Sequence, residues 1–164
     1  MYRLLSYIKF YISATNQHGV HSPFVYSYVT QCLYKKSNFR LPISQKILLK
    51  SLLYFDFKTV RILGDSVSVR KNIQAYCPDI NWNRDMNKAW YADESIDQFL
   101  EAEVPQMPND AVLIINGIHK TKRENEKWER LKNETFVRVT VDLFYCGVVF
   151  FRKEQAKEHF KIRI

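Results

Sequence analysis

Apolar residues recur at helical spacing through the first third of the chain. Residues 2–14 carry one apolar stripe, formed by Leu4, Leu5, Ile8, Tyr11 and Ile12. The period breaks at residues 15–21, and Ser22 before Pro23 has the pattern of a helix N-cap followed by proline in the first turn. Residues 44–55 are apolar nearly all round, which is typical of a buried helix. The N-terminal third is therefore predicted to be helical.

Short apolar runs and helical segments alternate after residue 58. Strands are expected at residues 59–63, 80–82 and 111–115, the last being a continuous apolar run typical of a buried strand. Helices are expected between residue 64 and residue 76, at residues 95–103, and after Thr121, which forms a capping box with Glu124. Alternating strands and helices predict an α/β fold with a partly parallel sheet.

The residues from 137 onward alternate with period two. Val137, Val139 and Val141 alternate with Arg138 and Thr140, as in a half-buried strand, and a second apolar run returns after a turn at residues 145–147. We predict a hairpin over residues 136–152 that forms the antiparallel edge of the sheet. Its three valines should face the helices, while Arg138 and Thr140 should face outward.

Length and composition set broad limits. The chain has 164 residues, of which 46% are hydrophobic and 26% charged, and this predicts one domain with a helical part (1–57) and an α/β part (58–164). No apolar run reaches the 18 or more residues of a membrane-spanning helix, and the first residues do not resemble a signal peptide. Three scattered cysteines suggest free thiols in a reducing compartment, so a cytoplasmic protein is expected.

Charge is distributed unevenly along the chain. Residues 1–55 contain seven Lys or Arg and no Asp or Glu, residues 56–118 contain six basic and ten acidic residues, and residues 119–164 contain twelve and seven. An acid-free basic segment suits a surface that meets an anionic partner, such as nucleic acid, lipid headgroups or an acidic protein. The same charges are equally compatible with helix faces that are merely solvated.

Two loops are candidates for chemistry, because ligands of parallel α/β sheets bind beyond the carboxyl ends of the strands. Gly64, Asp65 and Ser66 follow the strand at 59–63, and residues 116–119 follow the strand at 111–115. A glycine at such a turn lets the backbone approach a ligand, and a following helix offers free N–H groups to an anion. Both loops also fit ordinary strand-to-helix turns, and His119 fits either a base or a hydrogen-bonded structural histidine.

Other signatures of chemistry are missing. The four glycines have no dinucleotide-binding or P-loop spacing, and no nucleophile elbow, zinc-protease or RNA-binding motif occurs. His18 and His21 lie three residues apart but have no Cys or carboxylate near them in the sequence, so no metal site is predicted. We interpret these two histidines as structural, orienting the turn between the first two helices and packing against the residues after it.

Two segments near the ends of the chain carry a family resemblance. The first is NQHGVHSPFVY at residues 16–26; the second runs from VTVDLF at 139–144 through GVVFFRKEQ at 147–155 to KEHF at 157–160. Both are similar to the corresponding ends of a group of bacterial class I S-adenosylmethionine-dependent methyltransferases. The resemblance implies a reduced Rossmann-like methyltransferase sheet with a helical N-terminal segment and a C-terminal antiparallel hairpin.

The resemblance also implies a place for the cofactor. S-adenosylmethionine would lie beside Gly64, Asp65 and Ser66, with its ribose held by Asp85 or, alternatively, by Asp79 near the second strand. The glycine-rich turn of the family is reduced here to one glycine, and the acidic residue that precedes it in relatives is absent. Val67 and Val69 would add β-branched bulk at or after that turn, so we expect cofactor binding to be weak or lost.

Three functions follow as hypotheses. The first is an S-adenosylmethionine-dependent methyltransferase of reduced size; the glycine-poor turn favours a methyltransferase-like protein whose cofactor site is degenerate, with no catalytic residue assigned. The alternative is a non-catalytic binding protein on the same scaffold that uses its basic N-terminal helices to bind an anionic partner. The third is a nucleic-acid or membrane-surface protein unrelated to methyl transfer.

Overall fold

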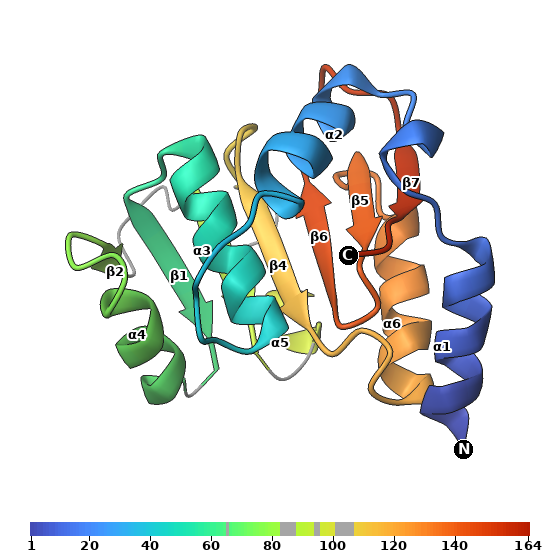
Figure 1. Cartoon of the computed structure of the whole chain (residues 1–164), viewed down its shortest axis with the longest axis horizontal. Helices are drawn as coiled ribbons and strands as arrows, with labels where there is room; N and C mark the ends of the chain where they lie inside the picture. Colours follow the sequence, from blue (N-terminus) through green and yellow to red (C-terminus); the bar gives the residue numbers. More distant parts are fainter. Residues whose placement is uncertain (65, 83–87, 94–95, 101–106) are drawn as a thin grey trace.

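The computed structural model describes the chain except for residues 65, 83–87, 94–95 and 101–106. Its described strands form one mixed sheet in the order β2-β1-β3-β4-β6-β5-β7 (Figure 1). These strands are β1 (Thr59–Leu63), β2 (Asn81–Trp82), β3 (Ala89–Ala92), β4 (Val112–Asn116), β5 (Val139–Asp142), β6 (Cys146–Phe150) and β7 (Glu158–Lys161). The α/β class with a partly parallel sheet is thereby confirmed.

Helices surround the sheet and carry most of the N-terminal third. They are α1 (Tyr2–Ser13), α2 (Pro23–Tyr28), α3 (Ile43–Phe55), α4 (Val67–Gln74), α5 (Asp97–Leu100) and α6 (Lys122–Asn133). A 3-10 turn at Gln17–Gly19 precedes α2, and a π-helical turn at Val29–Leu33 continues it. No helix in the described part of the chain is long and apolar enough to cross a membrane.

The direction of sheet growth changes at β1. Strands β1 to β4 are parallel, and β2 pairs with one side of β1 while β3 pairs with the other. In such sheets, ligands bind outside the carboxyl ends of the strands, at the point where the strand order reverses its direction of growth. The carboxyl ends of β1 and β3 are therefore the switch point of this sheet.

The core lies in two layers, one on each face of the sheet. Along β4, Val112 and Ile114 pack with α2, α3 and α4, whereas Leu113 and Ile115 pack with α5 and α6. Side chains alternate between the faces of a strand, so a strand covered on both faces is apolar at every position. This is why the apolar run at 111–115 correctly predicted a buried strand.

The hairpin forms as predicted, but it does not form the edge of the sheet. Strand β6 lies antiparallel between β4 and β5, and β7 then pairs in parallel with β5 on its outer side. Residues 158–161 therefore cover the N–H and C=O groups that β5 would otherwise leave unpaired.

The facing of the hairpin residues was predicted in part. Val139 and Val141 pack against the N-terminal helices as expected, and Arg138 is half-buried. Thr140 was expected to face outward but is buried, and its Oγ1 lies 2.9 Å from Nδ1 of His159 on β7. Val137 packs in the opposite core layer, with α5 and α6. It still belongs to the turn after α6, because its N–H donates to the Glu134 carbonyl, and the alternation of β5 begins only at Val139.

The turn before α2 is held by side-chain caps. Asn16 Oδ1 accepts a hydrogen bond from the His18 N–H at 3.0 Å, and Ser22 Oγ accepts one from the Val25 N–H at 3.4 Å. A side chain at Gly19 would overlap that of Thr15, which accounts for the glycine. His18 and His21 are both exposed, so the expected packing of their rings against the start of α2 is not supported.

Candidate functional site

Polar side chains converge at the switch point. Asp93 directly follows β3; its Oδ1 accepts a hydrogen bond from the Tyr91 hydroxyl at 3.0 Å, and its Oδ2 accepts one from Ser66 Oγ at 3.4 Å. Asn116, at the end of β4, donates its Nδ2 to the Asp93 carbonyl at 3.1 Å. Ser44 on α3 lies 2.8 Å from the Tyr91 hydroxyl. We call these five residues the switch-point cluster.

The local backbone explains why Ser66 reaches this cluster. Gly64 directly follows β1 and has a φ of +93°, a backbone conformation that residues other than glycine rarely adopt, and α4 begins three residues later. Burial is the main cause that raises the pKa of the Tyr91 hydroxyl, and the neighbouring Asp93 raises it further. Tyr91 therefore stays protonated and donates to Asp93, which leaves Ser44 as the donor to Tyr91.

The sequence located part of this cluster. Gly64 and Ser66 lie at the switch point as predicted, while Asp65 and Asp85 lie outside the described residues. Asp79, the other ribose candidate, precedes β2 and so lies at the amino end of that parallel strand, away from the switch point.

The two valines after the glycine turn differ in their surroundings. The side chain of Val67 is exposed on the first turn of α4, and that of Val69 is buried in the core layer beneath the helix. The expectation that they add bulk at the turn was therefore wrong for Val69, because the helix turns its side chain toward the sheet.

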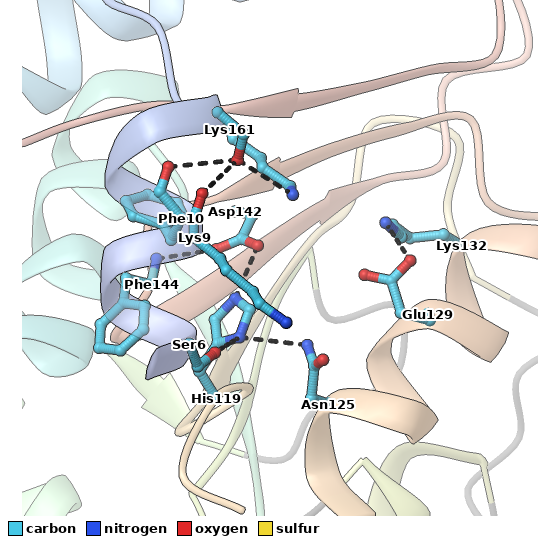
Figure 2. Close-up of polar contacts among 11 residues, drawn as sticks. Ser6, Lys9, Phe10, His119, Asn125, Glu129, Lys132, Asp142, Phe144 and Lys161 are labelled. Carbon is cyan, nitrogen blue, oxygen red and sulfur yellow. Dashed lines mark hydrogen bonds and ion pairs between the residues drawn. The ribbon is translucent and has the colours of Figure 1, made fainter. Parts of the chain in front are cut away.

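A second polar cluster surrounds His119, between the hairpin, α6 and α1 (Figure 2). His119 Nε2 lies 2.8 Å from Asp142 Oδ2, and both side chains are buried. A carboxylate only accepts hydrogen bonds, so Nε2 is the donor to Asp142. Ser6 Oγ and Asn125 Nδ2 each lie 3.1 Å from Nδ1 of the same ring. We call these four residues the His119 cluster.

Aromatic rings close the His119 cluster. The Phe144 ring stacks on the imidazole with centroids 5.0 Å apart and planes 11° from parallel, and Phe10 of α1 meets the imidazole edge-on at 6.1 Å. The Phe144 N–H donates to Asp142 Oδ1 at 2.8 Å, which helps to hold Phe144 at a φ of +66°. His119 thus has the contacts of a hydrogen-bonded structural histidine, one of the two interpretations left open by the sequence.

A cavity of about 270 Å³ joins the two clusters. It takes Ser44 and Asn116 from the switch-point cluster and His119 from the second. Arg3 and Lys120 are the charged residues of its lining among those that the structure describes, and no described carboxylate lines it. The described lining residues are Arg3, Pro42, Ile43, Ser44, Asn116, Gly117, His119, Lys120, Phe144 and Tyr145. Its positive charge favours an anionic or electron-rich ligand.

Neither a protein-family model nor a curated protein matches the chain. No group of three or more His, Cys, Asp or Glu side chains that could hold a metal ion occurs among the described residues.

The sequence did not identify several residues of these clusters. Tyr91 lies in β3 and Asp93 directly follows it. This strand was not predicted, so its carboxyl end was not considered as a place for a ligand. Asp142 has the position of an outward polar residue in an alternating strand, and Ser6 has that of a surface serine in α1. Asp93 could have been found from the sequence as a polar residue directly after a short apolar run, the same pattern that pointed to Asn116 at the end of β4.

Proposed function

We propose that the chain is a methyltransferase-like protein of the S-adenosylmethionine-dependent class whose cofactor site is degenerate. Support for the scaffold comes from the partly parallel sheet, its switch point after β1 and the antiparallel hairpin at its C-terminal side. These are the features that the resemblance of the two terminal segments implies. Weak or absent cofactor binding follows from the polar groups at the switch point.

The observation that carries the proposal is the set of contacts at Asp93. Both carboxylate oxygens already accept hydrogen bonds, one from Tyr91 and one from Ser66, and the Ser66 side chain is buried. A cofactor with a sulfonium, an amine and ribose hydroxyls would have to share this carboxylate with the Tyr91 and Ser66 donors. Sharing weakens each hydrogen bond that the ligand makes, so the described residues fit S-adenosylmethionine poorly.

The expected loss of affinity is large. One hydrogen bond to a charged group is worth about 1.5–3 kcal/mol, or roughly ten- to a hundredfold in affinity. Losing two of them moves a micromolar ligand to about the millimolar range. No catalytic step is therefore assigned to the switch-point cluster.

Calorimetric titration with S-adenosylmethionine and S-adenosylhomocysteine tests this. We expect no measurable binding, or a Kd near the millimolar range, from protein whose thermal unfolding is cooperative. A Kd of about ten micromolar or tighter contradicts the degenerate site. Should such binding occur, Asp93→Asn distinguishes a site at the switch point from one elsewhere. Asp110→Asn is the matched control, since Asp110 precedes β4 at the opposite end of the strands.

A second candidate function is a non-catalytic protein that binds an anionic partner through the basic segment 1–55. Five of its cations are exposed, namely Arg3, Lys9, Lys35, Lys36 and Arg40, and Arg3 also contributes to the positive lining of the cavity. Retention on immobilised heparin, a generic polyanion, should then fall steeply with salt. The matched test compares Lys35→Gln/Lys36→Gln with Lys122→Gln, an exposed lysine outside the segment. Equal retention of both variants contradicts this candidate.

A further inference from the structure

The apolar stripe of α1 faces solvent. Leu4 is 65% exposed, Ile8 46% and Ile12 79%, and Leu5 and Tyr11 between them are also exposed. The sequence predicted this stripe correctly, but the stripe contacts neither core layer. Contiguous exposed apolar surface of this kind usually marks a site of interaction.

The opposite side of α1 attaches the helix to the protein. Phe10 is the buried residue of α1 and packs with Ala14 and Phe144, while Ser6 bonds to His119. Figure 1 shows α1 at one end of the molecule, beside α6 and near β7. The inner face is therefore fixed, and the outward direction of Leu4, Ile8 and Ile12 is fixed with it.

The border of the apolar stripe is positively charged. Lys9 is exposed on α1 itself, and the helix contains no Asp or Glu. From the C-terminal strand region, the Arg163 guanidinium lies over the Tyr11 ring at 5.3 Å from its centroid, and Lys161 Nζ lies 3.3 Å from Ser13 Oγ (Figure 2 draws Lys9 and Lys161). An aliphatic face with cations at its rim has the pattern of a helix that lies in a lipid interface.

We propose that α1 binds the surface of an anionic lipid bilayer, with its aliphatic side chains among the acyl chains and its cations at the headgroups. Twelve residues make a helix about 18 Å long, which is too short to span a bilayer but sufficient to lie in its plane. The proposal deepens and rests on the second candidate function by naming its anionic partner, and it is independent of the cofactor site.

Two other occupants of this face fit less well. A second copy docked through the same face around a twofold axis would bring like cations together at the rim. Nucleic acid would engage the cations but leave Leu4, Ile8 and Ile12 in water, because its outer surface is phosphate and sugar. An anionic bilayer offers acyl chains to the aliphatic side chains and negatively charged headgroups to the cations.

The experiment is flotation of the full chain with two kinds of vesicle, phosphatidylcholine alone and phosphatidylcholine mixed with phosphatidylserine. We expect binding to the phosphatidylserine vesicles that weakens as salt is added. Ile8→Glu/Ile12→Glu should lower this binding by about a hundredfold, from roughly tenfold for each apolar side chain. Leu53→Glu is the matched control, an exposed leucine on α3.

Charge is tested by a second pair of variants. Lys9→Gln should weaken binding by about fivefold, while Lys71→Gln, an exposed lysine on α4, should leave it unchanged. All of these positions are exposed, and unchanged melting temperatures would show that the variants fold.

Four outcomes overturn the proposal: no vesicle binding, equal binding to both vesicles, full binding by Ile8→Glu/Ile12→Glu, or a dimer that this double substitution dissociates. Heparin retention without vesicle binding rejects lipid as the partner and leaves the second candidate function standing. If the natural chain shows no salt-dependent retention on heparin, both the lipid proposal and the second candidate function are rejected.

Discussion

Replacing Asp142 with alanine removes the acceptor of two buried hydrogen bonds at once. One comes from His119 Nε2 and the other from the Phe144 N–H, both at 2.8 Å. A hydrogen bond to a charged group contributes about 1.5–3 kcal/mol, so the substitution should lower the free energy of unfolding by about 3–6 kcal/mol. That is a large part of the roughly 5–15 kcal/mol by which domains are stable.

Urea unfolding followed by circular dichroism measures this loss. For a domain of this size each kcal/mol corresponds to about 2–4 °C, so the melting temperature should also fall by at least about 6 °C. The matched control is Asp110→Ala, which breaks an exposed ion pair with Lys88 and should cost at most about 1 kcal/mol.

A double-mutant cycle separates the two hydrogen bonds of Asp142. His119→Ala should cost at least about 1 kcal/mol less in the Asp142→Ala background than in the natural sequence, because its partner is already gone. Strict additivity, or an Asp142→Ala variant as stable as Asp110→Ala, would refute the assignment of a stabilising role to this pair.

Two further predictions concern buried side chains. Gly147→Ala should lower the free energy of unfolding by about 1–3 kcal/mol in chemical denaturation, because the new Cβ would lie 2.5 Å from the fully buried Trp128 ring; unchanged stability would mean that the ring moves aside freely. Iodoacetamide under native conditions should modify Cys77, which is partly exposed, well before Cys32 and Cys146, as mass spectrometry can show. Burial raises the pKa of the Cys32 thiol to about 12 and also raises that of the Cys146 thiol, so early alkylation of either would contradict the packing.

Local patterns in the sequence predicted the elements that local interactions determine. The predicted strand at 59–63 coincides with β1, and the N-cap half of the capping box forms as expected, with Thr121 Oγ1 accepting from the Glu124 N–H at 3.2 Å. Glu124 Oε1 pairs with Lys127 Nζ at 2.8 Å. Strand β3 was missed because Ala-Trp-Tyr-Ala is four residues long and has neither alternation nor β-branched residues. Missing β3 also hid Asp93, the centre of the switch-point cluster.

Long-range pairing was beyond the reach of these patterns. Alternation at residues 137–143 indicates a half-buried strand but does not say that another strand will cover its outer edge, which is what β7 does. Asp142 looks like an outward residue in that alternation, yet α1 and the loop holding His119 cover it. Its role in the His119 cluster depends on contacts between residues far apart in the sequence.

The two faces of α1 are subject to different physical demands. Phe10 and Ser6 contribute to folding, because they pack or bond against the hairpin turn and His119. Leu4 and Ile12 contribute little to the stability of the isolated chain, and Ile8 contributes in part, since water contacts much of their surface in the folded state. Polar residues at Leu4 and Ile12 would cost the fold little and would improve solubility. The proposed binding of α1 to an anionic lipid surface would remove these side chains from water, which would account for their aliphatic character and for the cations beside them.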